Sequence, residues 1–419
     1  MTGVARAAGA LFSPSRGTRF VIYTQWRRRA RDYKPEIITL AFRPGRVKAG
    51  PADQDMYVLD ARRKPPYSHE RTGRTLALPP YPEGRPRYPA VRPTRGGHFD
   101  HLKPGTRRFS SVSVFATVHC VVQIWSHYFR RPLLPWFFAA SRRRLEMIPR
   151  VESANAWSGD GFLEFGYVNW DTRIRFADLF DVVAHETGHL ILKKVIGNPS
   201  EGSKTLAYRA HEEAGADLIA LVAALHFDSV VDRLLWRTRG ALFSVNELSR
   251  LAEYSRKREV RELFNRERMS SGRIRQAAIA YRAHTYSLPF SGAAYDVLVG
   301  LYLENLRARG ILGPVGARRR TKAPRHALAV AQRSFRRRFG TRRRFEASRA
   351  ALKDALLDAR DTFARILARA WAMTRVEGFS YQRAAGHLLR ADRAVSGGRN
   401  ARMIRDLFAW RGIVADERA

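Results

Sequence analysis

Short apolar runs mark the first part of the chain, whereas apolar positions three and four residues apart mark the second part. The runs at residues 20–25 and 37–42 predict two short strands. Residues 146–167 predict a further strand region. Residues 65–104 are rich in proline, glycine and tyrosine and predict a linker or an extended segment laid over the surface.

Helical spacing dominates elsewhere. Residues 112–129 and 177–195 each predict a long helix, and Gly197 and Pro199 follow the second one, as is common after a helix end. A helix carrying Glu213 is expected to continue to residue 226. Further helices are expected at residues 242–254, 274–284, 293–307, 327–339 and 347–374. The last of these has a narrow apolar stripe, which predicts a surface position.

These patterns predict an α+β protein in three parts. Residues 1–105 form an arm or accessory region, residues 106–200 a mixed α/β lobe, and residues 201–419 a mainly helical lobe. The chain has 419 residues, of which 45% are hydrophobic. That content supports a real core and excludes a chain that is disordered throughout.

Candidate chemistry lies in the helix predicted at residues 177–195, which contains the pattern His-Glu-x-x-His at residues 185–189. At 3.6 residues per turn, His185 and His189 share one face, so both imidazoles can point at one ion. Glu186 lies on the same turn and can reach a water on that ion. This is the arrangement of zinc hydrolases, and the alternative is two helix histidines on a half-buried face.

A third ligand is needed, because catalytic zinc sites usually carry three protein ligands. The downstream segment His-Glu-Glu-Ala-Gly-Ala-Asp at residues 211–217 is also helical in pattern. Glu213 and Asp217 are one turn apart. We therefore expect Glu213 to bind the metal and Asp217 to hydrogen-bond a ligand imidazole.

The zinc pattern with a downstream Glu-x-x-x-Asp resembles the gluzincin metallopeptidases, and the flanking residues look most like the thermolysin group. The likeness covers residues 108–414 in islands. In that group an edge strand carrying Asn-Ala precedes the zinc helix, as Asn155 and Ala156 do here. The family's histidine followed by a serine is matched by His284 and Ser287. The chain end, residues 391–413, is similar to the family's last helices.

The resemblance implies a zincin-type fold, with the active-site cleft between a mixed α/β lobe and a helical lobe. It implies a zinc-dependent endopeptidase in which His185, His189 and Glu213 hold one Zn²⁺ and Glu186 is the general base. His284 would stabilise the oxyanion, with Ser287 orienting it. Asn155 and Ala156 would bind the substrate backbone by β-augmentation.

The chain also departs from the family. The nearest candidate for its transition-state tyrosine is Tyr208, for which ordinary packing is the expected role. A calcium-binding carboxylate cluster is not evident, and neither is a propeptide. No Gly-x-Met-Glu-Asn motif is present, which argues against an aminopeptidase.

The formal charge of +38 rests on arginine, since only ten of the 76 basic residues are lysine. One interpretation is a coding bias that fills solvated surfaces with arginine. The other is an anionic partner, such as nucleic acid, a membrane surface or an acidic substrate. The alternative function is therefore a basic nucleic-acid-associated protein whose protease-like domain acts on bound proteins or only binds.

The densest arginine runs are at residues 27–29, 142–144, 318–320 and 336–344. The last is the best candidate for an anion-binding patch. Phe339 and Phe345 could stack on bases there, and amphipathic packing explains them equally well.

Cys120, the only cysteine, lies in an apolar run and is expected to be buried, and an intramolecular disulfide is impossible. A possible metal cluster at His98, Asp100 and His101 is expected to be surface or capping detail. The first twelve residues do not resemble a signal peptide, which favours the cytoplasm. No run approaches 18 uninterrupted apolar residues, so no transmembrane helix is predicted.

Overall fold

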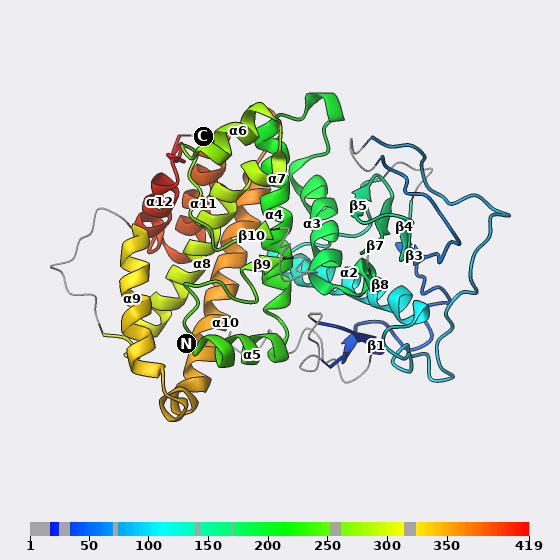
Figure 1. Ribbon diagram of the computed structural model, residues 1–419, viewed down its shortest axis with the longest axis horizontal. Helices are drawn as coiled ribbons and strands as arrows, with labels where there is room; N and C mark the ends of the chain where they lie inside the picture. The colour runs from blue at the N-terminus through cyan, green and yellow to red at the C-terminus, as the bar shows by residue number, and fades with distance from the viewer. Residues whose placement is uncertain are drawn as a thin grey trace. The chain divides into compact units, whose positions relative to one another are not determined.

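The structure is a computed structural model, which describes residues 17–24, 34–69, 74–138, 143–168, 171–251, 261–313 and 324–418. The chain divides into two compact units. The first comprises Met1–Lys194 and Ala252–Arg258, and the second comprises Val195–Leu251 and Glu259–Ala419. The α+β class is confirmed, with sheets in the N-terminal part and a largely helical C-terminal half (Figure 1).

The first unit contains eight described strands in small sheets. Their bounds are β1 Thr18–Ile22, β2 Glu36–Leu40, β3 Met56–Val58, β4 Leu145–Ile148, β5 Ala156–Gly159, β6 Phe162–Phe165, β7 Tyr167–Val168 and β8 Asp171–Arg175. The main sheet has the order β3-β4-β6-β5. β4 pairs parallel with both β3 and β6, and β5 pairs antiparallel with β6. The strands predicted at residues 37–42 and 146–167 are confirmed. The strand predicted at residues 20–25 is confirmed as far as residue 22, and residue 25 lies outside the described residues.

A buried polar network ties the segment after β3 to this sheet. Glu146 on β4 and Glu164 on β6 are both fully buried. The Tyr67 hydroxyl donates to Glu146 at 2.8 Å, and Lys64 forms an ion pair with Glu164. Tyr81 adds a backbone N–H bond to Glu146 at 2.9 Å. The carboxylates thereby hold the extended chain across the sheet, because buried charges require such partners.

Helix α2, Arg107–Phe129, is the core helix of the first unit. Thr106 caps it by accepting from the N–H of Phe109, which explains why the helix begins five residues before the predicted start. Phe20 stacks on Phe99 and contacts Phe115 of α2, at ring-centroid distances of 5.4 and 5.8 Å. By length and composition α2 could cross a membrane, but 89% of its apolar window is buried inside the protein. A bent pair of helices, Leu206–Ala224 and Asp228–Thr238, meets the same test only when taken as one span.

The remaining helix of the first unit follows β8 directly. A 3-10 turn, η2, spans Phe176–Asp178, and α3 spans Phe180–Ile196. Its end confirms the predicted stop, since Gly197 adopts a φ of +133°, a conformation that favours glycine.

The second unit is built almost entirely from helices. After a 3-10 turn, η3 Glu201–Ser203, their bounds are α4 Leu206–Ala224, α5 Asp228–Thr238, α6 Gly272–Ile279, α7 Ala283–Tyr286, α8 Leu288–Ala308, α9 Pro324–Phe339, α10 Arg342–Met373, α11 Tyr381–Ser396 and α12 Ala401–Trp410. One short antiparallel pair joins β9 Arg250–Leu251 to β10 Arg261–Glu262. The helices predicted at residues 293–307, 327–339 and 347–374 are confirmed.

The prediction of a helix at residues 242–254 is wrong for the residues of that range that the structure describes. Residues 242–249 form turns, β9 follows, and residues 252–254 lie outside the described residues. The side chain of Asn246 organises these turns: its amide donates to the Leu242 and Ser244 carbonyls, and its oxygen accepts from the N–H groups of Leu248 and Ser249. An asparagine that bonds so many nearby backbone groups replaces the helical hydrogen bonds.

Two further expectations need correction. The long helix α10 is not a surface helix, because it buries a face that includes Leu352, Leu356 and Phe363. The helix expected at residues 274–284 is broken into α6 and α7. Tyr281 lies at the break with a left-handed φ of +52°, which no helical residue adopts.

Candidate metal centre

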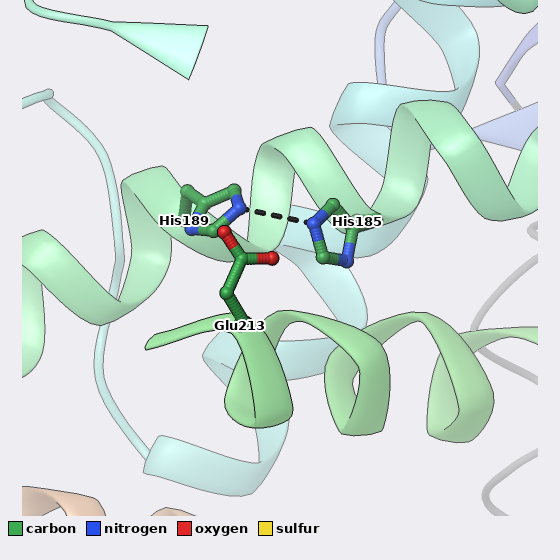
Figure 2. A group of neighbouring side chains, drawn as sticks. All are labelled: His185, His189 and Glu213. Atoms are coloured by element: carbon green, nitrogen blue, oxygen red, sulfur yellow. Dashed lines mark hydrogen bonds between the residues drawn. The ribbon is translucent and has the colours of Figure 1, made fainter. Parts of the chain in front are cut away.

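Helix α3 carries the two histidines of the sequence pattern. His185 is buried and His189 is half-buried. As the spacing of four residues predicts, both rings lie on one face of the helix, and their Nε2 atoms are 3.0 Å apart (Figure 2). Two nitrogens that each bind one zinc ion at about 2.0–2.1 Å in a tetrahedral arrangement would be roughly 3.3 Å apart. The pair is therefore arranged to share one ion.

Glu213 supplies the third ligand atom from α4. The helix begins at Leu206, where Thr205 accepts a hydrogen bond from the N–H of Tyr208 and so caps its first turn. One ligand atom from each of His185, His189 and Glu213 lies within 4.8 Å of the other two. Figure 2 shows the Glu213 carboxylate directed at the two imidazoles. The structure thus brings together the three residues that the sequence predicted as metal ligands.

His284 lies on the short helix α7 and contacts this group through Glu213. Its Nδ1 atom is 2.9 Å from Oε2 of Glu213, and its side chain is 59% exposed. The Ser287 hydroxyl donates to the backbone carbonyl of His284 at 2.7 Å. Ser287 therefore fixes the helix that carries His284 and does not bond the imidazole.

Tyr281 is a residue near the centre that the sequence analysis missed. Its hydroxyl donates to the Lys204 carbonyl at 2.8 Å, which ties the break before α7 to the loop before α4. Its left-handed φ holds the chain in a sparsely populated conformation three residues before His284. No glycine, asparagine or proline marks this turn, so the sequence carried no signal for it.

The predicted general base and supporting acid are both enclosed. Glu186 follows His185 on α3 and is 8% exposed. Asp217 lies one turn after Glu213 on α4 and is 2% exposed. Their roles in catalysis and in orienting a ligand stay predictions.

Asn155 and Ala156 lie where β5 begins. Ala156 pairs with Phe165 of β6, and the Asn155 carbonyl accepts from the N–H of Gly166 at 2.9 Å. Within the part of the chain that the structure describes, β5 has β6 as its one partner strand and so forms an edge of the main sheet. An edge strand offers unpaired backbone groups to an extended peptide.

Three other polar residues are accounted for by packing. Tyr208 is 1% exposed, and its hydroxyl donates to the Gly197 carbonyl at 2.8 Å, as expected for a packing role. His98 accepts from the N–H of Arg19, and Asp100 pairs with the Arg19 guanidinium, so this cluster is local capping detail. Among the described residues, the only group suited to a metal is that of Figure 2.

His211 is a buried histidine of α4 whose pKa is lowered by its surroundings. It is 1% exposed and packs against Phe290 and Phe379. Burial lowers the pKa of its imidazole to about 3, so the ring is neutral at physiological pH. Although it lies two residues from Glu213, it is not one of the three grouped ligands.

No known family model matches the chain, and no curated protein matches it. The assignment of the centre therefore rests on its donors and their geometry. Two imidazole nitrogens and one carboxylate oxygen form a set that suits zinc and other first-row transition ions. The three residues form a possible metal-binding site on two helices.

Proposed function

We propose that the chain is a zinc-dependent endopeptidase of the gluzincin type. The observation that carries this proposal is the convergence of His185, His189 and Glu213 within 4.8 Å, with Glu186 directly after the first histidine. A structural zinc site is usually closed by four protein ligands, often cysteines. This chain has a single, buried cysteine, and three grouped ligands leave a position for substrate or water.

The three ligands would hold one Zn²⁺, which when bound supplies Lewis-acid polarisation of the scissile carbonyl and acidifies water to a pKa near 7. Glu186 accepts the proton of the attacking water and delivers it to the amine that leaves. The role requires a carboxylate beside the ligands that is not itself a ligand, which matches its place in the sequence pattern.

His284 has two tasks in this proposal. Through Nδ1 it contacts the carboxylate of Glu213, and through Nε2 it donates to the oxyanion that forms on the attacked carbonyl. Asp217 holds a ligand imidazole in the tautomer that leaves its Nε2 free to bind metal. The backbone at Asn155 and Ala156 on the edge of the sheet binds the substrate peptide as an added strand.

The test measures zinc content and casein hydrolysis on the wild type and on Glu186→Gln. We expect one equivalent of zinc in both proteins. Chelator-sensitive hydrolysis is expected only in the wild type, with a loss of at least a hundredfold in the variant. Glu346→Gln, at an exposed position on α10, is the matched control and should keep full activity.

Two outcomes would contradict the proposal. Absence of bound zinc from the purified and zinc-treated wild type would remove the metal site. Undiminished hydrolysis by Glu186→Gln would remove the general base, even if zinc is bound.

A further inference from the structure

The turn between α9 and α10 gathers a group of arginines that the metal centre does not use. We call it the arginine turn and define it by seven residues. They are Arg333, Arg336, Arg337, Arg338, Arg342, Arg343 and Arg344. All seven side chains are exposed. Figure 1 shows α9 in yellow and α10 in orange meeting at this turn, so the two arginine runs belong to one end of a helix pair.

The arginine turn has no internal compensation for its charge. No acidic residue occurs in residues 324–345. Within the described part of the chain, none of the seven guanidinium groups forms an ion pair. The situation changes one turn further along α10, where Arg349 and Lys353 both pair with Asp232 of α5. Seven exposed guanidinium groups without an ion pair thus lie within residues 333–344.

The phenylalanines beside the arginine turn are buried, which leaves the arginines on the exposed side of the two helices. Phe335, Phe339 and Phe345 are 0%, 3% and 0% exposed, and the rings of Phe335 and Phe339 lie 4.6 Å apart. Packing is therefore the role of Phe339 and Phe345, and neither ring can stack on a base. Nor can these rings enter a lipid layer, because they are already buried inside the protein.

Arg342, Arg343 and Arg344 lie at the helix end where cations are unfavourable. They form the first turn of α10, where the macrodipole is positive and favours anions. This first turn has no acidic residue, and the Thr341 side chain makes no capping hydrogen bond. Acidic or capping residues would stabilise this first turn, so the three arginines do not contribute to the stability of α10. An anion at this turn would relieve the repulsion and meet the free backbone N–H groups.

We propose that the arginine turn binds the phosphate backbone of nucleic acid without reading its sequence. Arginines on two successive helices suit an extended polyanion better than one small anion, and guanidinium groups bind phosphate in a bidentate manner. Contacts limited to phosphates position a protein but carry no base information.

A nucleic acid fits this surface better than a membrane does. Membrane-surface helices add exposed apolar side chains that enter the lipid. Among the described residues, Trp236 is a large apolar side chain exposed beside the turn, at 37%, and the guanidinium groups of Arg239 and Arg342 lie 4.2 and 5.4 Å from its ring centre. That ring is thus already packed by cations.

The experiment measures binding of the full chain to a fluorescent 30-base-pair DNA duplex by anisotropy, over a series of NaCl concentrations. The turn variant replaces the six residues Arg336–Arg338 and Arg342–Arg344 by glutamine. The matched control replaces six exposed, unpaired arginines of the first unit by glutamine. These are Arg43, Arg46, Arg85, Arg87, Arg92 and Arg95. Both variants lose six of the formal +38 charges, so only the location differs.

We expect the wild type to bind two unrelated duplex sequences equally, with a steep salt dependence. The turn variant should lose at least tenfold in affinity at low salt, and the slope of log K against log salt should become shallower by about one for each phosphate that is no longer neutralised. The control should stay within about threefold of the wild type. A variant with the same six positions changed to lysine should retain most of the slope, and it tests the proposal if the glutamine variant does not fold.

Three outcomes would overturn the proposal. Equal losses in the turn variant and the control would mean that binding follows net charge. A tenfold preference for one duplex sequence would mean base readout. Binding to phosphatidylserine vesicles through the turn, without binding to DNA, would identify a membrane as the partner.

Discussion

The Nδ1 atom of His284 lies 2.9 Å from Oε2 of Glu213, so a residue of α7 contacts a predicted metal ligand of α4. Groups that contact a metal ligand on the side away from the ion set the orientation of that ligand and the affinity for the metal. Their loss typically costs 10–100-fold in metal binding. His284 is thus expected to strengthen metal binding even in the absence of substrate.

His284→Ala should therefore weaken zinc binding by about 10–100-fold. The measurement is a zinc titration against a chelating dye, with thermal unfolding of the metal-free protein followed in parallel. Because the ring is more than half exposed, the melting temperature should hardly change. His326→Ala, at an exposed position on α9, is the control. Unaltered zinc affinity in His284→Ala would show that the contact with Glu213 has no role in holding the metal.

Lys64→Met should destabilise the first unit. The lysine is 3% exposed and pairs with the fully buried Glu164, close to the second buried carboxylate of Glu146. Removing it leaves a buried carboxylate without its cation, which costs about 3–5 kcal/mol in the free energy of unfolding. Lys64→Met combined with Glu164→Gln should recover most of that loss, as urea unfolding of the two variants would reveal. Equal destabilisation in both would mean that the charge of Glu164 is not the cause.

Asp178→Asn should stabilise the protein at neutral pH and not at pH 4. Burial raises the pKa of Asp178 to about 6 from a usual 3.8, although Ser110 and Arg175 act to lower it. The folded state then binds more protons than the unfolded state between these values, so stability falls as the pH rises from about 4 to 6. The neutral amide avoids this loss, which is up to about 3 kcal/mol above pH 6. Urea unfolding at pH 4 and 7.5 checks the prediction, and an equal effect at both values would contradict it.

Changing Arg342, Arg343 and Arg344 together to glutamine should raise the melting temperature. The three cations oppose the dipole at the start of α10, and their removal should return roughly 1 kcal/mol, or about 2–4 °C, at low salt. The triple change of Arg336–Arg338 to glutamine is the matched control. Those residues lie in the last turn of α9, where the dipole favours cations, so the control should lower the melting temperature or leave it unchanged. Calorimetry at low salt distinguishes the two by the sign of the shift, and high salt should shrink both shifts because it screens the charges.

The two histidines of the candidate metal centre were predictable because their relationship is local. Two histidines four residues apart need only a helix to share a face, and α3 provides it. Glu213 was expected because the site needs a third ligand and because the helical pattern of α4 places it one turn before Asp217. Its approach to the histidines of α3 is not local information. The contact between His284 and Glu213 joins residues 71 positions apart, and spacing along a chain says nothing of such a distance.

The errors in the helical half had three different causes. At residues 242–249 the apolar spacing indicated a helix, but Asn246 bonds several backbone groups and imposes turns. Helix α5 was missed although its signals were present. Asp228 occupies its first turn, and Val230, Val231 and Leu234 show helical spacing. The surface position expected for α10 failed because a narrow apolar stripe still packs between neighbouring helices when small alanines flank it.

Cys120 lies fully buried in α2, and burial raises the pKa of its thiol well above the usual value. The protein therefore behaves toward thiol reagents as though it had no cysteine. A cysteine introduced at an exposed site, such as Ile279 at 88% exposure, would be the single reactive thiol on the folded molecule. Spectroscopic labels can thus be attached one at a time beside the metal centre or the arginine turn, with the native core left intact.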